Sequence, residues 1–346
     1  MTPVLRIDLD AFTANLAHIR AEVAPAEHML VVKDDAYGHG LAPIIRRAWA
    51  ASVRWFGAFD VHTGAVVRAQ LGDDARIFVW LAGSDDEIRT AEALDFDLGV
   101  GDLDLLEDVA RIASASSRRV RVHLKIDTGL HRNGIRPEQW DAAVSAAAAH
   151  QEAGSIEVVG LWTHLAEASD DEDDAAVTGF REAMIAAERA GLRPALRHVA
   201  ASAASFARRE FRHDLVRIGA FAYGIRPAGG PDHATLGIRP IATLAAPVIR
   251  IDDEGVHVAI GALHGLPSTL SGRVRVAGPA GPRTLLRVGA LTSLIESWPE
   301  ALIGDDVAVY GDGAASPTEL AEAIGTIGEE IAVRVSPLVP REYRDG

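Results

Sequence analysis

Between residues 28 and 225, short and continuously apolar runs alternate with stretches whose apolar residues recur at helical spacing. Apolar runs that do not alternate with polar residues are typical of parallel strands covered on both faces. Eight such runs, most followed by a helical pattern, favour a closed (β/α)8 barrel over an open sheet. The eight runs are residues 29–33 (MLVVK), 55–60 (WFGAFD), 77–83 (IFVWLAG), 96–100 (FDLGV), 120–127 (VRVHLKID), 156–162 (IEVVGLW), 196–200 (LRHVA) and 215–221 (LVRIGAF).

The pattern changes near residue 235, where short strand patterns follow one another between Gly, Pro and acidic turns. This predicts a mostly β second domain with one helix at about residues 317–325. We therefore expect an α/β barrel domain over residues 1–234 and a β-rich domain over residues 235–346. The strand patterns of the second domain are residues 239–251, 255–263, 272–278, 283–291, 306–311 and 331–340 (IAVRVSPLVP).

The N-terminal residues precede the first run of the barrel. A strand over residues 4–9 could pair with either domain. The apolar stripe of Phe12, Leu16 and Ile19 predicts a helix over residues 11–23.

Composition narrows the class of function. Hydrophobic residues make up 48% of the 346 residues, as in a globular protein, and the formal net charge is −15. An acidic chain without a basic stripe is a poor partner for nucleic acid or an anionic membrane surface. The absence of cysteine excludes disulfides and thiolate metal sites. The first residues carry Asp8 and Asp10 where a signal peptide needs apolar residues, so we expect a cytoplasmic protein.

Lysine is used at only two positions. Of the 34 basic residues, Lys33 and Lys125 are the lysines and all others are arginine. Unlike a guanidinium, an amine can lose its proton, form a Schiff base or take up carbon dioxide. Lys33 ends an apolar run in VVKDDAYGHG (residues 31–40), and Lys125 ends another. Both therefore fall where a barrel carries its chemistry, at the C-terminal ends of strands.

Other polar side chains fall at matching strand ends. Each has an ordinary explanation by itself, because most lysines are solvated and most arginines pair with surface acids. At the ends of different strands of one barrel they make a site. These residues are Lys33, Lys125, Arg132, His164, Ser202 and Arg217.

Five segments in order give this site a family resemblance. They are VVKDDAYGHG, VHLKIDTGLHRNGI, GLWTHLAEASD, RHVAASAASF and DLVRIGAFAYG. Together they resemble the alanine racemases, which use pyridoxal 5'-phosphate, and an ordered set over some two hundred residues is far more specific than one motif.

The resemblance assigns the cofactor residues. Lys33 would be the Schiff-base lysine and the base on the D face of the substrate; the alternative is a surface lysine. Tyr37 would bind the cofactor phosphate, or else only pack at a strand end. Ser202 and the backbone of Gly219 and Ala220 would complete the phosphate site, where helical N–H groups suit an anion.

The resemblance also assigns the residues around the cofactor ring. Arg217 would face the pyridine nitrogen and keep it unprotonated, because a guanidinium does not give up its proton. His164 would lie near the ring. His198 would hold Arg217 in place, or else serve packing alone.

Lys125 occupies a position that is often carbamylated in this family. There it would orient Arg132, which reaches the cofactor phenol and the substrate carboxylate. Burial would favour the neutral amine that carbamylation needs. The alternative is an ion pair of Lys125 with Asp127. We expect no metal, since the acidic run DDEDD (residues 170–174) is better explained as a solvated helix start.

The β-rich domain departs from the family pattern. By resemblance, Ala262 stands where the family has its second base, a tyrosine that serves the L face. Ser293 and Leu294 stand where the family has the Met-Asp pair that contacts the substrate carboxylate. His264 is the titratable residue nearest to Ala262 and could replace the tyrosine, because residues two apart on a strand share a face.

Three functions remain open at this point. The first is an amino-acid racemase with an altered substrate or an altered second base. The second is a one-base enzyme that performs elimination, decarboxylation or half-transamination. The third is a silent paralogue that binds pyridoxal phosphate. The resemblance implies a small amino acid as substrate and a homodimer.

Overall fold

The computed structural model describes residues 2–345, which fold into two compact units. The barrel unit comprises residues 19–33 and 52–219, and the β unit comprises residues 1–18, 34–51 and 220–346. These units cut the chain elsewhere than at residue 234, because the N-terminal strand pairs with strands near the C-terminus.

The barrel unit contains eight parallel strands in the order β8-β7-β6-β5-β4-β3-β2-β9. All eight predicted strands are present, and the prediction of a barrel is confirmed. Between β8 and β9, backbone hydrogen bonds from Asp214 to Arg197 (3.2 Å) and from Arg217 to Ala200 (3.1 Å) bring the two edges together. The strands are β2 (Glu27–Val31), β3 (Trp55–Asp60), β4 (Arg76–Leu81), β5 (Asp97–Val100), β6 (Val120–Lys125), β7 (Ile156–Trp162), β8 (Leu196–His198) and β9 (Leu215–Ile218).

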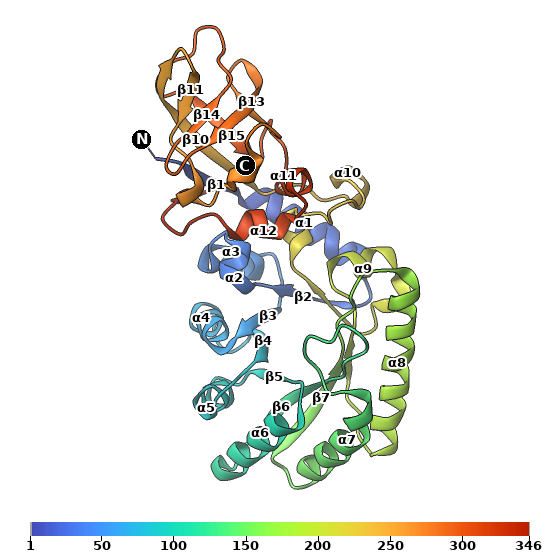
Figure 1. The fold of residues 1–346 in the computed structure, drawn as a ribbon. Helices are drawn as coiled ribbons and strands as arrows, with labels where there is room; N and C mark the ends of the chain where they lie inside the picture. Colours follow the sequence, from blue (N-terminus) through green and yellow to red (C-terminus); the bar gives the residue numbers. More distant parts are fainter. Residues whose placement is uncertain (1, 346) are drawn as a thin grey trace. The chain divides into compact units, whose positions relative to one another are not determined.

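Helices lie on the outside of these strands (Figure 1). Four of them begin at a polar cap directly after a strand or its short loop: Asp60, Ser84, Asp102 and Ser169 each accept a hydrogen bond from the backbone N–H three residues on. DDEDD is the first turn of the helix that Ser169 caps, as predicted. The helices are α4 (Val61–Leu71), α5 (Asp85–Ala93), α6 (Leu103–Ser116), α7 (Pro137–Glu152), α8 (Asp170–Arg189), α9 (Ser202–Ala207) and η1 (Arg209–Phe211).

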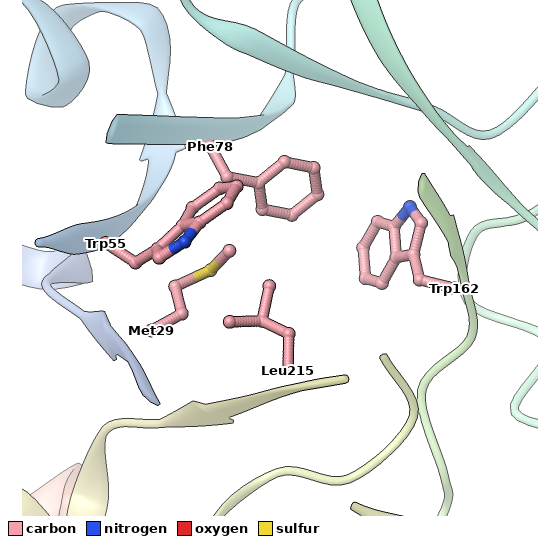
Figure 2. Close-up of a cluster of buried hydrophobic side chains, with 5 residues drawn as sticks. All are labelled: Met29, Trp55, Phe78, Trp162 and Leu215. Carbon is pink, nitrogen blue, oxygen red and sulfur yellow. The ribbon is translucent and has the colours of Figure 1, made fainter. Parts of the chain in front are cut away.

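Large apolar side chains fill the inside of the barrel. Met29, Trp55, Phe78, Trp162 and Leu215 come from five different strands and point toward one another (Figure 2). All five are at most 5% exposed. Because burying such a side chain contributes about 1.5–3 kcal/mol, this cluster holds the strands whose ends carry the site.

The β unit is built on a second eight-stranded sheet, in the order β11-β14-β13-β12-β15-β10-β1-β16. The N-terminal strand β1 pairs antiparallel with β10 and parallel with β16. The strands are β1 (Val4–Asp8), β10 (Ala242–Asp252), β11 (Gly255–Val258), β12 (Arg275–Gly278), β13 (Gly281–Val288), β14 (Ser293–Ile295), β15 (Asp306–Tyr310) and β16 (Arg341–Arg344).

Short helices complete the β unit, and α1 (Leu9–Val23) and α2 (Lys33–Tyr37) each have residues in both units. No helix in the part of the chain that the structure describes has the length and hydrophobicity that crossing a membrane requires. The other helices are α3 (Leu41–Ala50), η2 (Ala220–Tyr223), α10 (His233–Leu236), η3 (Ala262–His264), η4 (Ser268–Leu270), α11 (Pro317–Ile324) and α12 (Gly328–Val333).

One strand prediction was wrong. The segment IAVRVSPLVP alternates like a strand, but its first three residues lie in α12 and the rest form turns. Gly328 begins this helix in a tight place, where a Cβ would lie 2.5 Å from Thr318 Oγ1 and 2.7 Å from a methyl of Ile225. Tertiary packing therefore overrides the β propensity of Ile331 and Val333.

Candidate active site

Arg217 is the centre of the candidate site. It lies on β9, is 5% exposed, and its two Nη groups donate to five acceptors. The acceptors are His198 Nδ1 and the His198 carbonyl (2.9 Å each), the carbonyls of Thr163 and Val199 (2.9 Å each) and His164 Nδ1 (3.1 Å). The Nε–H has no acceptor among residues 2–345, so the guanidinium keeps one donor for a ligand.

The two histidines beside Arg217 are held neutral. Burial and the charge of Arg217 lower the pKa of both His164 and His198 well below the ordinary value. Since each ring offers Nδ1 to an N–H of Arg217, the proton of the neutral ring is on Nε2. Burial also lowers the pKa of Arg217 itself, to about 9, so the guanidinium is still a cation at neutral pH.

Lys125 ends β6 inside the barrel and is 5% exposed. Its Nζ donates to Asn133 Oδ1 (3.3 Å) and lies 4.6 Å from the centre of the Trp162 ring. Burial and the charges of Arg217 and Arg132 lower its pKa to about 8. The expected alternative, an ion pair with Asp127, does not occur among the described residues, because Asp127 pairs with His131 Nδ1 at 3.1 Å.

Positive charge gathers at this end of the barrel although the chain is acidic. Arg132 lies exposed in the loop after β6. Its charge, with those of Lys33, Lys125 and Arg217, lowers the pKa of His164 after the larger effect of burial. A site with four cations suits a ligand that carries phosphate or carboxylate groups.

Lys33 lies two residues after the end of β2, with Val32 between them, and it is half-buried. The chain leaves it through a left-handed turn, since Asp34 to Tyr37 all have φ between 53° and 56°. Left-handed geometry costs about 1–2 kcal/mol per L-residue, so the surrounding contacts must hold it. Asp35 Oδ1 accepts from the Leu41 N–H (2.7 Å), and the Asp34 carbonyl accepts from Gly38 (2.8 Å).

Tyr37 belongs to the β unit. It is buried there, with its ring centre 4.8 Å from that of Tyr223. Burial, with the charges of Glu329 and Asp34, raises the pKa of its phenol, so it is a neutral hydrogen-bonding group at every ordinary pH.

The expected phosphate site is partly assembled in the barrel unit. Ser202 is the first residue of α9, and its Oγ accepts from the Gly219 N–H at 3.3 Å. Ala220 begins η2 in the β unit and is 8% exposed. The barrel unit therefore brings together eight of the expected residues: Lys33, Lys125, Arg132, His164, His198, Ser202, Arg217 and Gly219.

Comparison with known proteins bears on the family of this chain. The alanine racemase N-terminal domain family matches residues 7–227. The alanine racemase of Thermobifida fusca is 34% identical over 371 residues, which covers 98% of this chain and 97% of that protein. The chain belongs to the alanine racemase family. Its curated relatives are named alanine racemase, and a racemase is an isomerase.

Solved structures of alanine racemases have the same fold over the whole chain. The enzyme from Streptomyces coelicolor A3(2) superposes with a TM-score of 0.94 at 32% identity, covering 100% of this chain and 98% of that one. The enzyme from Streptomyces lavendulae gives 0.93 at 32% identity, with the same coverage.

The segment around Ala262, where the resemblance places the second base, forms η3, a 3₁₀ helix, and not a strand. Ala262 is exposed in it. With three residues per turn, positions two apart do not share a face, so the argument that His264 replaces residue 262 by strand geometry was wrong. His264 Nδ1 instead accepts from the Gly261 N–H at 3.1 Å.

Ser293 and Leu294 lie on β14 and offer little to a ligand. Ser293 is 1% exposed, and its hydroxyl donates to the Ile260 carbonyl at 2.6 Å. Leu294 is 9% exposed and has no polar group.

Sequence reasoning missed several residues that shape the site. Asn133 holds Lys125, the Thr163 carbonyl holds Arg217, and Trp162 stacks on His198 with an interplanar angle of 13°. His123 could have been found, since it lies two residues before Lys125 on β6 and therefore faces the same side. Asn133 carried no such signal, because a loop brings it back to the strand.

Proposed function

We propose that this protein is a pyridoxal 5'-phosphate-dependent amino-acid isomerase that resembles alanine racemase and has an altered second base or an altered substrate. One observation carries the proposal. Arg217 is buried with both Nη groups committed to protein acceptors, while its Nε–H has no acceptor in the part of the chain that the structure describes, at the strand ends where Lys33 and Lys125 also lie.

The donor set fits this cofactor. A pyridine nitrogen is an acceptor without a proton, which matches the remaining N–H of a guanidinium that stays charged. The Lys33 amine is the group that bonds an aldehyde, and Ser202 with the backbone of Gly219 would bind the phosphate. Tyr37 and Ala220, which belong to the β unit, are assigned to the phosphate by the family resemblance alone. When bound, the cofactor would accept electron density from Cα and so make its proton acidic.

The chain's own residues would supply orientation and proton transfer. Arg132, with Lys125 behind it, would bind the substrate carboxylate at the cationic end of the barrel. His164 and His198 hold Arg217 through neutral nitrogens and add no charge of their own. Lys33 would hold and return the Cα proton on one face of the substrate.

The second face of the substrate is where we expect this protein to differ from its family. Ala262 has no proton to give, and the Nδ1 atom of His264 is taken by a backbone N–H. Racemisation needs a proton donor on each face. A racemase and a one-base enzyme would therefore differ in their products, and a silent paralogue would form none. Cofactor binding alone would not separate these three functions.

Covalent capture tests the proposal. We expect the protein incubated with pyridoxal 5'-phosphate to absorb visible light, and borohydride to fix the cofactor on the peptide that contains Lys33, as read by mass spectrometry. Lys33→Ala should lose both the absorption and the adduct.

The second lysine provides the matched control. Lys125→Ala removes the only other ε-amine in the chain and should keep the adduct on Lys33. An adduct that persists in Lys33→Ala, or one found on Lys125 in the unaltered protein, would overturn the assignment.

A further inference from the structure

A chain of hydrogen bonds runs through the inside of the barrel and ends at Arg217. The Asp97 carboxylate contacts His123 Nε2 (3.2 Å), His123 Nδ1 contacts His198 Nε2 (2.8 Å), and His198 Nδ1 contacts Arg217 Nη1 (2.9 Å). Asp97, His123 and His198 are each 0% exposed. They come from β5, β6 and β8, and Arg217 comes from β9, so these hydrogen bonds link four strands of the barrel.

The chemistry of its two ends fixes the direction of every bond. A carboxylate only accepts and a guanidinium only donates. His123 must therefore carry its proton on Nε2 and accept on Nδ1. His198 must do the same, because its Nε2–H is the donor to His123 and its Nδ1 is the acceptor for Arg217. Both rings are neutral, and one arrangement of protons satisfies all three bonds.

The ionisation of the three buried groups agrees with this direction. Burial opposes ionisation of Asp97, but hydrogen bonding with His123 and the charges of Arg76 and Arg121 outweigh it and lower the pKa of the carboxyl. Burial lowers the pKa of His123 and of His198, so both rings are neutral. Arg76 and Arg121 both form ion pairs with Asp97.

The barrel sheet leaves space for the imidazole rings of this hydrogen-bond chain. His123 lies opposite Gly160 of β7, and a Cβ at Gly160 would sit 2.1 Å from His123 Nδ1. Phe78 packs on both imidazoles, with ring centres 4.7 Å from His123 and 5.4 Å from His198. The rings are therefore held in place by a strand without a side chain on one side and by an aromatic ring on another.

We infer that Asp97 and His123 are positioning residues for Arg217, acting through His198. They anchor the His198 ring through its Nε2–H, which keeps Nδ1 directed at Arg217 and fixes the guanidinium in the orientation that leaves its Nε–H without an acceptor among residues 2–345. The effect on cofactor binding rests on the proposed function, whereas the proton arrangement is a property of the protein alone.

Nitrogen NMR on the cofactor-free protein tests the arrangement directly. With ¹⁵N-labelled histidine, we expect His123 and His198 to show pyrrole-type shifts at Nε2 and pyridine-type shifts at Nδ1. His123→Phe should shift the Nε2 signal of His198, because that N–H has lost its acceptor, while Nδ1 stays pyridine-type because Arg217 still donates to it. An imidazolium, or an Nδ1–H form of His198 in the unaltered protein, would overturn the inference.

Cofactor affinity tests the consequence. His123→Phe should weaken binding of pyridoxal 5'-phosphate about tenfold, and should have less than about a twofold effect when Arg217 is already Gln. Phe78→Leu is the matched control, since it perturbs the same packing without breaking a hydrogen bond and should leave affinity within about twofold. If His123→Phe and Phe78→Leu weaken cofactor binding equally, His123 contributes only by packing and the inference is wrong.

Two further measurements distinguish a failure of this inference from a misfolded variant or a failure of the proposed function. If His123→Phe does not fold, Asp97→Asn tests the same chain, because it removes the charge and keeps the shape, and it should also shift the His198 nitrogen signals. If the unaltered protein binds no pyridoxal phosphate, the proposed function fails, while the NMR result still decides whether the proton arrangement is right.

Discussion

At the scale of single residues, burial changes the chemistry available to the groups inside the barrel. Lys125 is enclosed by Asn133, Trp162 and nearby cations, so more of it is neutral than in an ordinary lysine. Arg217 is enclosed more fully and remains charged. Lys125 and Arg217 therefore serve different purposes: Lys125 can react as an amine, whereas Arg217 donates hydrogen bonds.

Lys125 should take up carbon dioxide, because the neutral amine is the reactive form. With its pKa lowered to about 8, roughly one-tenth of the amine is neutral at pH 7, some 300-fold more than for an ordinary lysine. We expect a carbamate signal in ¹³C NMR after addition of labelled bicarbonate, stronger at pH 8 than at pH 6.5. Lys125→Arg should abolish the signal, and its persistence there would place the carbamate elsewhere.

At the scale of elements, the close approach of β6 and β7 depends on a residue without a side chain. We expect Gly160→Ala to reduce the free energy of unfolding by about 1–3 kcal/mol, since its Cβ would collide with His123. Urea denaturation measures this. Gly179→Ala in α8 is the control, because its Cβ meets only Thr128 at 3.8 Å, and it should stabilise by up to about 1 kcal/mol. No loss in Gly160→Ala would mean that the His123 ring is mobile.

The sequence predicted elements well where burial and periodicity agree. All eight barrel strands, the helix after Ser316 and the acidic start of α8 follow from apolar runs and caps. The failures have identifiable causes. The left-handed turn after Lys33 could not be predicted, because none of its four αL residues is a glycine. The helix α12 forms against the β propensity of its sequence, because Gly328 packs closely on Thr318.

The site could be predicted only as far as strand ends and family motifs reach. Lys125 and Arg217 follow from the family motifs and from their places within apolar runs that form barrel strands. Asp97 begins β5, at the opposite end of that strand, so its role depends on a chain of contacts through the core that no local pattern encodes. The geometry around His264 was likewise hidden, because a 3₁₀ turn replaces the expected strand.

At the scale of the whole molecule, we propose a homodimer in which the surface around Ala262 is covered by the partner. Backbone hydrogen bonds join the segments of residues 262–264, 289–290 and 336. Leu263, Leu291 and Leu338 beside them are 67%, 58% and 87% exposed. Exposed leucines on adjoining segments mark an interaction surface.

Light scattering tests the dimer. We expect the unaltered protein to have twice the mass of the chain and Leu263→Asp to shift it toward the monomer. Leu302 is 66% exposed on the turn before β15, so Leu302→Asp is the control and should remain dimeric. A monomer that still binds pyridoxal phosphate would contradict this arrangement.

Exchange of the Cα proton in heavy water decides how many bases the assembled enzyme has. For His264 to act as a base through Nε2, its proton would have to move to Nδ1, which faces the Gly261 N–H. We therefore expect Lys33 to act alone, with deuterium entering one enantiomer only and configuration retained. By family resemblance that enantiomer is the D form. Alanine should turn over slowly, since Ser293 and Leu294 present no polar group to its carboxylate.

Each other outcome assigns a different function. Exchange from both enantiomers with inversion would establish a second base, and His264→Ala should then abolish reaction of the L form while leaving that of the D form. No exchange with alanine or with larger amino acids, in protein that carries the cofactor on Lys33, would favour a silent paralogue. Alanine racemisation at rates ordinary for enzymes, on the order of 10 per second or more, would show that Ala262 is no obstacle and that another group supplies the second proton.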